Sequence, residues 1–139
     1  MKVHQETLRH RTSGHGDLQD LTHEVAAVVA RSGITKGLVH VHIVGSTAAL
    51  GTIEFEPGLQ QDLPTLMDRL VPPHEHYMHE QTWHDGNAHA HLQATLLGAS
   101  VTVPVRDGMP VLGTWQQIVL LECDVRPRQR EIVVTVQGV

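Results

Sequence analysis

The sequence predicts an α+β fold, in which one compact domain combines a mixed or antiparallel sheet with two to three helices. The chain of 139 residues has the size of one ordinary domain, and 40% hydrophobic residues are sufficient for one packed core. Helical and strand-like periodicities follow one another in mixed order, and the last third of the chain is strand-like. No repeat or linker divides the sequence, so residues 1–139 are expected to form a single domain.

The first part of the chain predicts a strand followed by a helix. Residues 2–12 are strand-like and end at the turn cluster of residues 13–17. A helix is expected from Asp20, with Asp20 or Thr22 as its cap, and Gly33 ends it. Its residues at helical spacing on one face are Leu21, Val25, Val28, Val29 and Ser32.

The next segment predicts a strand, a turn, a short strand and a second helix. Residues 37–44 alternate, with His40 and His42 on one face and the apolar residues on the core face. The small residues 45–49 indicate a turn, and residues 52–56 a short strand. A helix over 59–71 follows and ends at two prolines.

One more helix and several strands complete the chain. Asn87 is expected to cap a helix over 88–97, whose alanine, leucine and threonine residues on nearly all sides indicate a buried, central element. Strands are expected over residues 100–105, 110–122 and 130–136, and Asp107 and Gly108 form a hairpin turn between the first two.

The composition disfavours several kinds of partner. The net charge of −5 disfavours binding to nucleic acid or to anionic lipid, and the aromatic content of 3% disfavours a surface for base stacking. Cys123 is the only cysteine, which excludes an internal disulfide and fits a reducing compartment. The longest apolar run, residues 25–30, is too short to cross a membrane, and no leader opens the chain, so a cytoplasmic protein is expected.

A histidine-rich segment is the first candidate functional site. It interleaves imidazoles with acidic side chains, the donor types that bind Zn, Mg or Mn. Two residues of a helix that are two apart point about 160° away from each other, so only one of His89 and His91 is expected to be a ligand, and His91 is the more inward. The expected metal set is His79, His91 and Asp85. His74, His76 and His84 are alternatively explained as a histidine-rich surface loop.

Three other clusters offer polar groups. Arg126, Arg128 and Arg130 would line up in an extended chain at steps of about 6.6 Å and bind phosphate, or alternatively form a solvated strand edge. Residues 45–54 offer hydroxyls that would bind an anion and Glu54 as a base or metal ligand. Alternatively, the small residues of this segment only allow a turn to pack tightly. Residues 113–117 contain Trp115, which is either a ligand contact or a plain core side chain.

These clusters resemble, in order, the YjbQ or UPF0047 family, described as secondary thiamine-phosphate synthases. The matching stretches are DLTHEV, STAALGTIEFEPGLQQDL, YMHEQTWHDGNAHAHLQATLLGASVTVPV and LGTWQQIVLLECDVRPRQR. The resemblance implies a YjbQ-like α+β protomer, a homotrimer and sites near subunit boundaries. The family pattern falls on Ser46, Thr47, Glu54, His79, Asp85, Asn87, His91, Thr114, Trp115, Gln116 and Arg128.

This chain departs from the family pattern at two places. Many members have a histidine where Gly45 stands, and His40 or His42 is the candidate replacement. The stretch from Asp124 to Arg128 is one residue longer than the usual acidic-Gly-Pro-Arg form.

The leading hypothesis is a metal-assisted transferase of thiamine-phosphate synthase type, which joins a pyrimidine methyl diphosphate to a thiazole phosphate. A divalent ion and a small phosphorylated metabolite are its expected ligands. Glu54, Asp85 and Asn87 are the candidate catalytic residues. The candidate substrate-binding residues are Ser46, Thr47, Thr114, Trp115, Gln116, Arg126, Arg128 and Arg130. The alternatives are a metal-dependent hydrolase or lyase acting on another phosphorylated metabolite, and a non-catalytic trimeric module that binds a metal or an anion.

Overall fold

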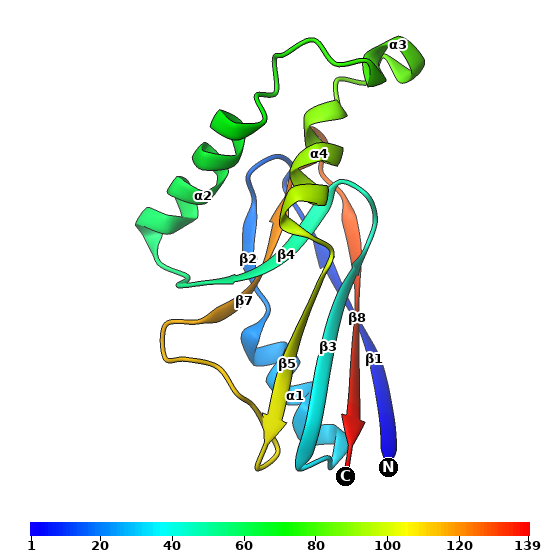
Figure 1. The fold of residues 1–139 in the computed structure, drawn as a ribbon, viewed down its shortest axis with the longest axis vertical. Helices are drawn as coiled ribbons and strands as arrows, with labels where there is room; N and C mark the ends of the chain where they lie inside the picture. Colours follow the sequence, from blue (N-terminus) through cyan, green and yellow to red (C-terminus); the bar gives the residue numbers. More distant parts are fainter.

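Two antiparallel sheets form the framework of the protein (Figure 1). The computed structural model describes all residues from Met1 to Val139. The larger sheet has five strands in the order β1-β8-β3-β5-β6. Their bounds are Lys2–Arg11 for β1, Gln129–Gly138 for β8, Lys36–Val44 for β3, Ser100–Arg106 for β5 and Met109–Pro110 for β6. The smaller sheet has the order β2-β7-β4, with bounds Leu18–Asp20, Gln117–Glu122 and Ala48–Ile53.

Four helices complete the single α+β domain. They are α1 (Thr22–Ser32), α2 (Pro57–Leu70), α3 (His79–Trp83) and α4 (Ala88–Leu97). In Figure 1, α1 lies toward the end that carries both termini, whereas α3 lies at the opposite end. None of these helices is both long and apolar enough to cross a membrane.

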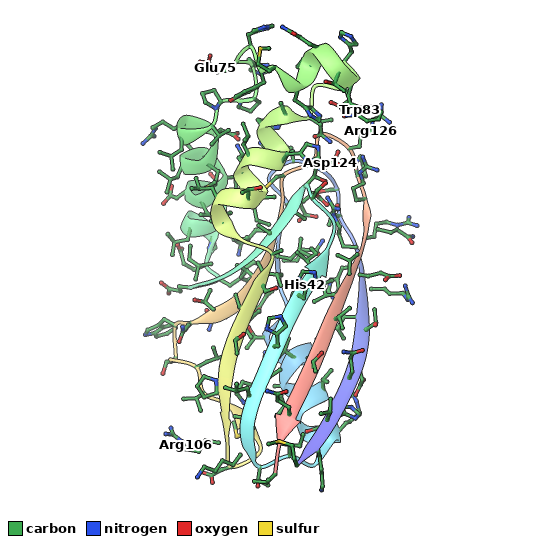
Figure 2. All side chains as sticks on the ribbon, turned by 45° about the vertical axis from the view of Figure 1, so that its right-hand side comes forward. His42, Glu75, Trp83, Arg106, Asp124 and Arg126 are labelled. Atoms are coloured by element: carbon green, nitrogen blue, oxygen red, sulfur yellow. The ribbon has the colours of Figure 1, made fainter.

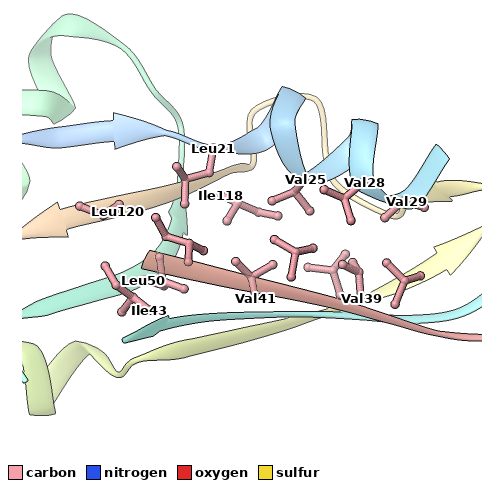
Figure 3. Packing of buried hydrophobic residues seen from close by; sticks show 14 of the residues in the cluster. Leu21, Val25, Val28, Val29, Val39, Val41, Ile43, Leu50, Ile118 and Leu120 are labelled. Carbon is pink, nitrogen blue, oxygen red and sulfur yellow. The ribbon is translucent and has the colours of Figure 1, made fainter. Parts of the chain in front are cut away.

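The main core lies between the larger sheet on one side and α1 with strands β4 and β7 on the other (Figure 3). A second, smaller core lies on the other face of β7, against α2 and α4. Successive residues of β7 therefore contact different cores: Ile118 and Leu120 belong to the main core, and Val119 and Leu121 to the second. Burial on both faces explains the continuous apolar run of this strand.

Most expected elements are present, and several bounds differ. The helix over 88–97 and the positive-φ turn at Asp107 and Gly108 are confirmed. The expected strand over 110–122 is instead two strands, because β6 ends at Pro110 and β7 starts at Gln117. The short strand expected over residues 52–56 is instead β4 over Ala48–Ile53, so the turn expected over residues 45–49 is also shorter.

Two elements are additional to those expected, and two expectations about the helices need correction. Strand β2 and helix α3 were not anticipated, because elements of three and five residues contain too little periodicity. Helix α4 is buried on only one face, since Leu92 and Leu96 are exposed. The N-cap position of α1 is Leu21 and not Asp20 or Thr22, but the Asp20 carboxylate accepts a hydrogen bond from the backbone N–H of Thr22, the first residue of the helix.

Candidate functional site

Helices α3 and α4 bring two histidines together. The ring centroids of His79 and His91 lie 4.8 Å apart, with the ring planes inclined by 55°. The His79 Nε2 atom is buried without a hydrogen-bond partner and lies 3.5 Å from the Asp85 Oδ1 atom. The three residues expected to share a site are therefore neighbours, and each is at least partly accessible.

The short connection between the two helices is held by acidic side chains. The Glu80 carboxylate accepts hydrogen bonds from the backbone N–H groups of Gly86 and Ala88, at 2.8 and 3.4 Å. Asp85 accepts a hydrogen bond of 3.1 Å from the Asn87 N–H. These contacts satisfy N–H groups near the start of α4, so Glu80 has a positioning role that the sequence did not reveal.

Asn87 connects this helix end to the arginine-containing loop. Its side chain makes no capping hydrogen bond in α4, although the residue is the N-cap. Instead, the Asn87 Oδ1 atom accepts a hydrogen bond of 3.1 Å from the backbone N–H of Val125. The histidine segment and the loop after β7 are thus joined directly, and Figure 2 shows Asp124 and Arg126 at the end of the molecule that carries α3.

The Asp124 carboxylate is buried at this junction. Burial by itself raises the pKa of Asp124, but hydrogen bonds outweigh this effect and lower the pKa to about 2. The donors are the Arg126 N–H and the side chains of Asn87, Thr47 and Arg128. Asp124 therefore remains ionised and serves as an anchor for the loop.

Arg130 forms a buried ion pair with Glu122. Glu122 is fully buried, Arg130 is only 6% exposed, and the guanidinium donates two hydrogen bonds to the carboxylate. Thr12 donates a further hydrogen bond to Glu122, and Arg130 donates one to the Thr47 hydroxyl. The Arg130 side chain is therefore directed into the core.

The expected row of three arginines is consequently wrong. Strand β8 begins only at Gln129, so Arg126 and Arg128 lie in a loop and not along the strand. Arg128 is half-exposed and donates a hydrogen bond of 2.9 Å to Asp124, whereas Arg126 is exposed. Each guanidinium has a different environment because the loop turns before the strand starts.

The expectation that His91 is the more inward histidine of α4 is also wrong. His89 is 2% exposed, and His91 is half-buried. The His89 ring packs edge-on against His15 at 5.0 Å, and burial, together with His15, lowers the pKa of His89. His15 and Gln93 both donate to the Asp68 carboxylate, which ties α4 to α2 and to the turn after β1.

A second group of candidates lies at the opposite end of strand β4. Glu54, Thr114 and Trp115 line a pocket of about 330 Å³, together with Asp20, Thr22, His23, Phe55, Glu56 and Gln117. Strand β4 separates this pocket from Ser46 and Thr47, and its six residues extend about 17 Å. Within one chain, Glu54 and the hydroxyls therefore do not share a cavity.

The individual residues of this second group differ in environment. Trp115 is 72% exposed, so its interpretation as a core side chain is wrong. Gln116 does not line the pocket; its side chain lies 3.4 Å from the Thr52 hydroxyl and accepts a hydrogen bond from the Gly113 N–H. At the other end of β4, Ser46 is exposed and Thr47 is buried against Asp124.

His40 and His42 do not replace the family histidine at Gly45. A Cβ atom at Gly45 would lie 2.6 Å from the Arg130 Nη1 atom, inside the buried network. His40 and His42 instead lie on the outer face of β3, where they alternate with the buried Val41. The two locations are on opposite faces of the larger sheet.

The single cysteine does not supply a nucleophile. Cys123 is fully buried, and burial followed by the neighbouring Glu122 raises the pKa of its thiol to about 12. Thiolates, and not thiols, are the reactive species. Burial and the raised pKa therefore disfavour nucleophilic catalysis through Cys123.

The residues around His79 partly fit a divalent ion. The Nε2 atom of His79 has no hydrogen-bond partner, so it is free to act as a metal ligand, and a second imidazole and a carboxylate lie next to it. No group of three or more histidine, cysteine, aspartate and glutamate side chains, however, already converges in metal-binding geometry. The chain thus presents part of a donor set and not a closed metal cage.

Sequence reasoning missed the buried partners of the candidate residues. Glu122 follows the inward-facing Leu120 by two residues in β7, so a charged residue in that register indicated a buried pair. No such periodic signal marked the other partners. Glu80 lies in the short helix α3, and His15 and Asp68 contact each other although they are far apart in the sequence.

The comparisons with known proteins are consistent across the chain. The pattern of the family described as UPF0047 protein YjbQ-like matches residues 6–139. A UPF0047 protein of Methanothermobacter thermautotrophicus is 41% identical over 138 residues, which cover 99% of this chain and 94% of the relative. The UPF0047 protein YugU of Bacillus subtilis is 33% identical and covers 96% of this chain and 98% of the relative.

Two solved structures illustrate the shared fold. A YbjQ-like protein of unknown function from Sulfolobus solfataricus has a TM-score of 0.93 and 37% identity, covering 99% of both chains. The hypothetical protein APE1520 from Aeropyrum pernix has a TM-score of 0.87 and 32% identity, covering 100% of both chains.

Proposed function

Because the chain belongs to the YjbQ/UPF0047 family, we propose that it is a metal-assisted transferase of thiamine-phosphate synthase type that acts on small phosphorylated metabolites. The observation that carries the proposal is the approach of His79 and His91 to 4.8 Å beside Asp85. Two imidazoles and a carboxylate are a donor set that Zn, Mg or Mn accepts, and the anchored loop that carries Arg126 is joined to the same helix end.

His79, His91 and Asp85 would hold the divalent ion. Bound there, the ion would supply Lewis-acid stabilisation of the charge on a departing diphosphate. Because the chain contains no closed three-residue group, oxygen atoms of a bound phosphate or solvent would complete the coordination. The proposal therefore expects metal and phosphorylated ligand to bind more tightly together than separately.

Two arginines of the loop would hold the phosphate. Arg126 is exposed and takes part in no ion pair, and Arg128 uses only its Nε atom to bind Asp124, so its terminal nitrogens remain available. Arg130 is engaged by Glu122 and would act only by fixing Thr47 and the start of β8. Charge-assisted hydrogen bonds from Arg126 and Arg128 would then orient the substrate.

The pocket beside Glu54 would supply the second half of the site. In this proposal, the chain forms a homotrimer in which Glu54, Thr114 and Trp115 of one protomer lie beside the His79 and His91 pair of its neighbour. The separation of the two groups along β4 within one protomer supports this arrangement. Glu54 would position the second heterocycle or move a proton.

The test is an assay for thiamine phosphate with purified trimer, both phosphorylated precursors and a series of divalent metals. We expect product formation that depends on metal. The variant His91→Ala should lower the rate about 100-fold or more, whereas the control His76→Ala, an exposed histidine of the same segment, should leave it unchanged.

Three other outcomes would contradict the proposal. A folded trimer that forms no product with any metal would remove the transferase activity. Turnover of other compounds from a panel of phosphate esters would identify a hydrolase or lyase. Stoichiometric metal retention without any turnover would identify a binding module.

A further inference from the structure

Two parallel imidazoles stand on the outer face of the larger sheet. His40 and His42 are two residues apart on β3, so both side chains project from the same face. Their ring centroids are 6.4 Å apart, and the ring planes are inclined by only 11°. Strand β3 is paired with β5 on one side and β8 on the other, which makes it a rigid support.

Each ring is oriented by a hydroxyl group of the neighbouring strand. The His40 Nδ1 atom lies 2.8 Å from the Thr102 Oγ1 atom, and the His42 Nδ1 atom lies 2.7 Å from the Ser100 Oγ atom. These pairs follow the register of β3 and β5, in which His40 is opposite Thr102 and His42 opposite Ser100. When Nδ1–H donates to the hydroxyl oxygen, the lone pair of Nε2 is free.

This arrangement is the one by which proteins prepare histidine as a metal ligand. A hydrogen bond from the second ring nitrogen selects the tautomer and leaves the other nitrogen free to bind an ion. Here the same device occurs twice, at adjacent positions of one strand face. The two rings lie farther apart than one ion requires, since metal–nitrogen distances are about 2.0–2.1 Å, so binding requires them to tilt toward each other.

The surroundings favour an ion that prefers nitrogen. A shallow pocket of about 330 Å³ beside His40 is lined also by Leu38, Thr102, Thr135 and Gln137, none of them charged. The nearest acidic residue in the register, Glu131, is opposite Val44 and paired with Arg9. Without carboxylates, Mg²⁺ and Ca²⁺ are disfavoured, whereas Zn²⁺, Ni²⁺ and Cu²⁺ accept imidazole.

We propose that His40 and His42 form an open, two-histidine site for a transition-metal ion such as Zn²⁺, with Thr102 and Ser100 as positioning residues. No third histidine, cysteine or acidic side chain converges there, so solvent or a small ligand fills the remaining positions. Such a site exchanges its ion readily. It is independent of the metal ion proposed at His79 and His91, which lie on α3 and α4.

The test is a calorimetric titration of the metal-free protein with Zn²⁺ in the double variant His79→Ala/His91→Ala, which removes the other histidine pair. We expect one remaining site per chain. His40→Ala or His42→Ala should lower its affinity at least about 10-fold, and Thr102→Val should lower it about 10- to 100-fold, with recovery in Thr102→Ser. The matched control His76→Ala, an exposed histidine that lies outside both proposed metal sites, should not change it.

The proposal would be overturned if the double variant bound no Zn²⁺, or if its binding did not change in His40→Ala and His42→Ala. The titration uses the variant that already lacks His79 and His91. A failure of the His40 and His42 site is therefore measured separately from a failure of the proposed transferase activity. Far-ultraviolet circular dichroism of each variant shows that the sheet is intact.

Discussion

At the scale of single residues, the Glu122–Arg130 pair determines which arginines of residues 126–130 are available to bind a ligand. Both side chains are buried and every hydrogen bond of the carboxylate is made inside the protein. A buried charge that loses its partner cannot recover the hydration that folding removed. The pair therefore explains why Arg130 cannot be released to bind substrate.

Arg130→Met should destabilise the protein by about 3–5 kcal/mol, because it leaves Glu122 buried and uncompensated. Arg9→Ala, which removes the exposed pair with Glu131, should cost no more than about 1 kcal/mol. Urea unfolding at one fixed protein concentration measures both. Equal effects would show that burial of the pair does not control its contribution.

Gly45 is constrained by its neighbours and by its backbone. Its φ is +139°, and a Cβ atom would approach Arg130 to 2.6 Å. We expect Gly45→Ala to destabilise the protein by about 1–3 kcal/mol. Gly51→Ala in β4 is the control, since nothing lies within 4 Å of its added Cβ, and it should be neutral or slightly stabilising. Thermal unfolding of the two variants would distinguish them.

Asp124 makes stability depend on acid pH. Its folded pKa of about 2 lies below the ordinary value of 3.8, so the ionised form contributes stability above about pH 4 that is lost as the pH falls toward 2. The contribution is about 2 kcal/mol. In Asp124→Asn this dependence should be absent. Unfolding free energies of both proteins between pH 2 and 6 check the prediction, and parallel curves would contradict it.

At the scale of elements, α4 shows what periodicity can and cannot predict. Its bounds and its N-cap residue followed from the local sequence, because helix termini are set by residues within one turn. The buried face did not follow. Alanine, leucine and threonine occur on nearly all sides of α4, so the apolar pattern does not indicate which face is buried. Contacts with His15 and Asp68 determine the buried face.

Two substitutions on the buried face of α4 should have opposite effects. Both ring nitrogens of His89 are buried without partners, so His89→Leu should keep or raise the stability. Gln93→Leu should cost about 1–3 kcal/mol, because it removes hydrogen bonds to Asp68 and to the Val71 carbonyl. Chemical unfolding of both variants tests this, and marked destabilisation by His89→Leu would indicate an unrecognised role.

At the scale of the whole molecule, the two candidate groups are separated by the length of β4. A site shared between protomers predicts complementation. Glu54→Gln and His91→Ala should each be inactive alone, but trimers mixed at random should recover about one quarter of the activity, since one pairing in four joins two intact halves. The assay is thiamine phosphate formation after co-refolding.

The control for the complementation experiment is the mass of each preparation, measured by light scattering. Single-variant and mixed trimers should all have about three times the chain mass of 15.3 kDa. Mixed trimers that remain inactive would show that each site belongs to a single protomer. A monomeric mass would contradict the shared site altogether.

The amino-acid sequence by itself determined the family, the α+β class, most helices and strands, and the proximity of His79, Asp85 and His91, because backbone periodicity and turn residues act over a few positions. The tertiary structure alone decided that Arg130 is buried, that His89 faces inward and that Glu54 lies far from Thr47. These outcomes depend on which distant elements pack together, and that choice is made by the whole core and not by any local stretch.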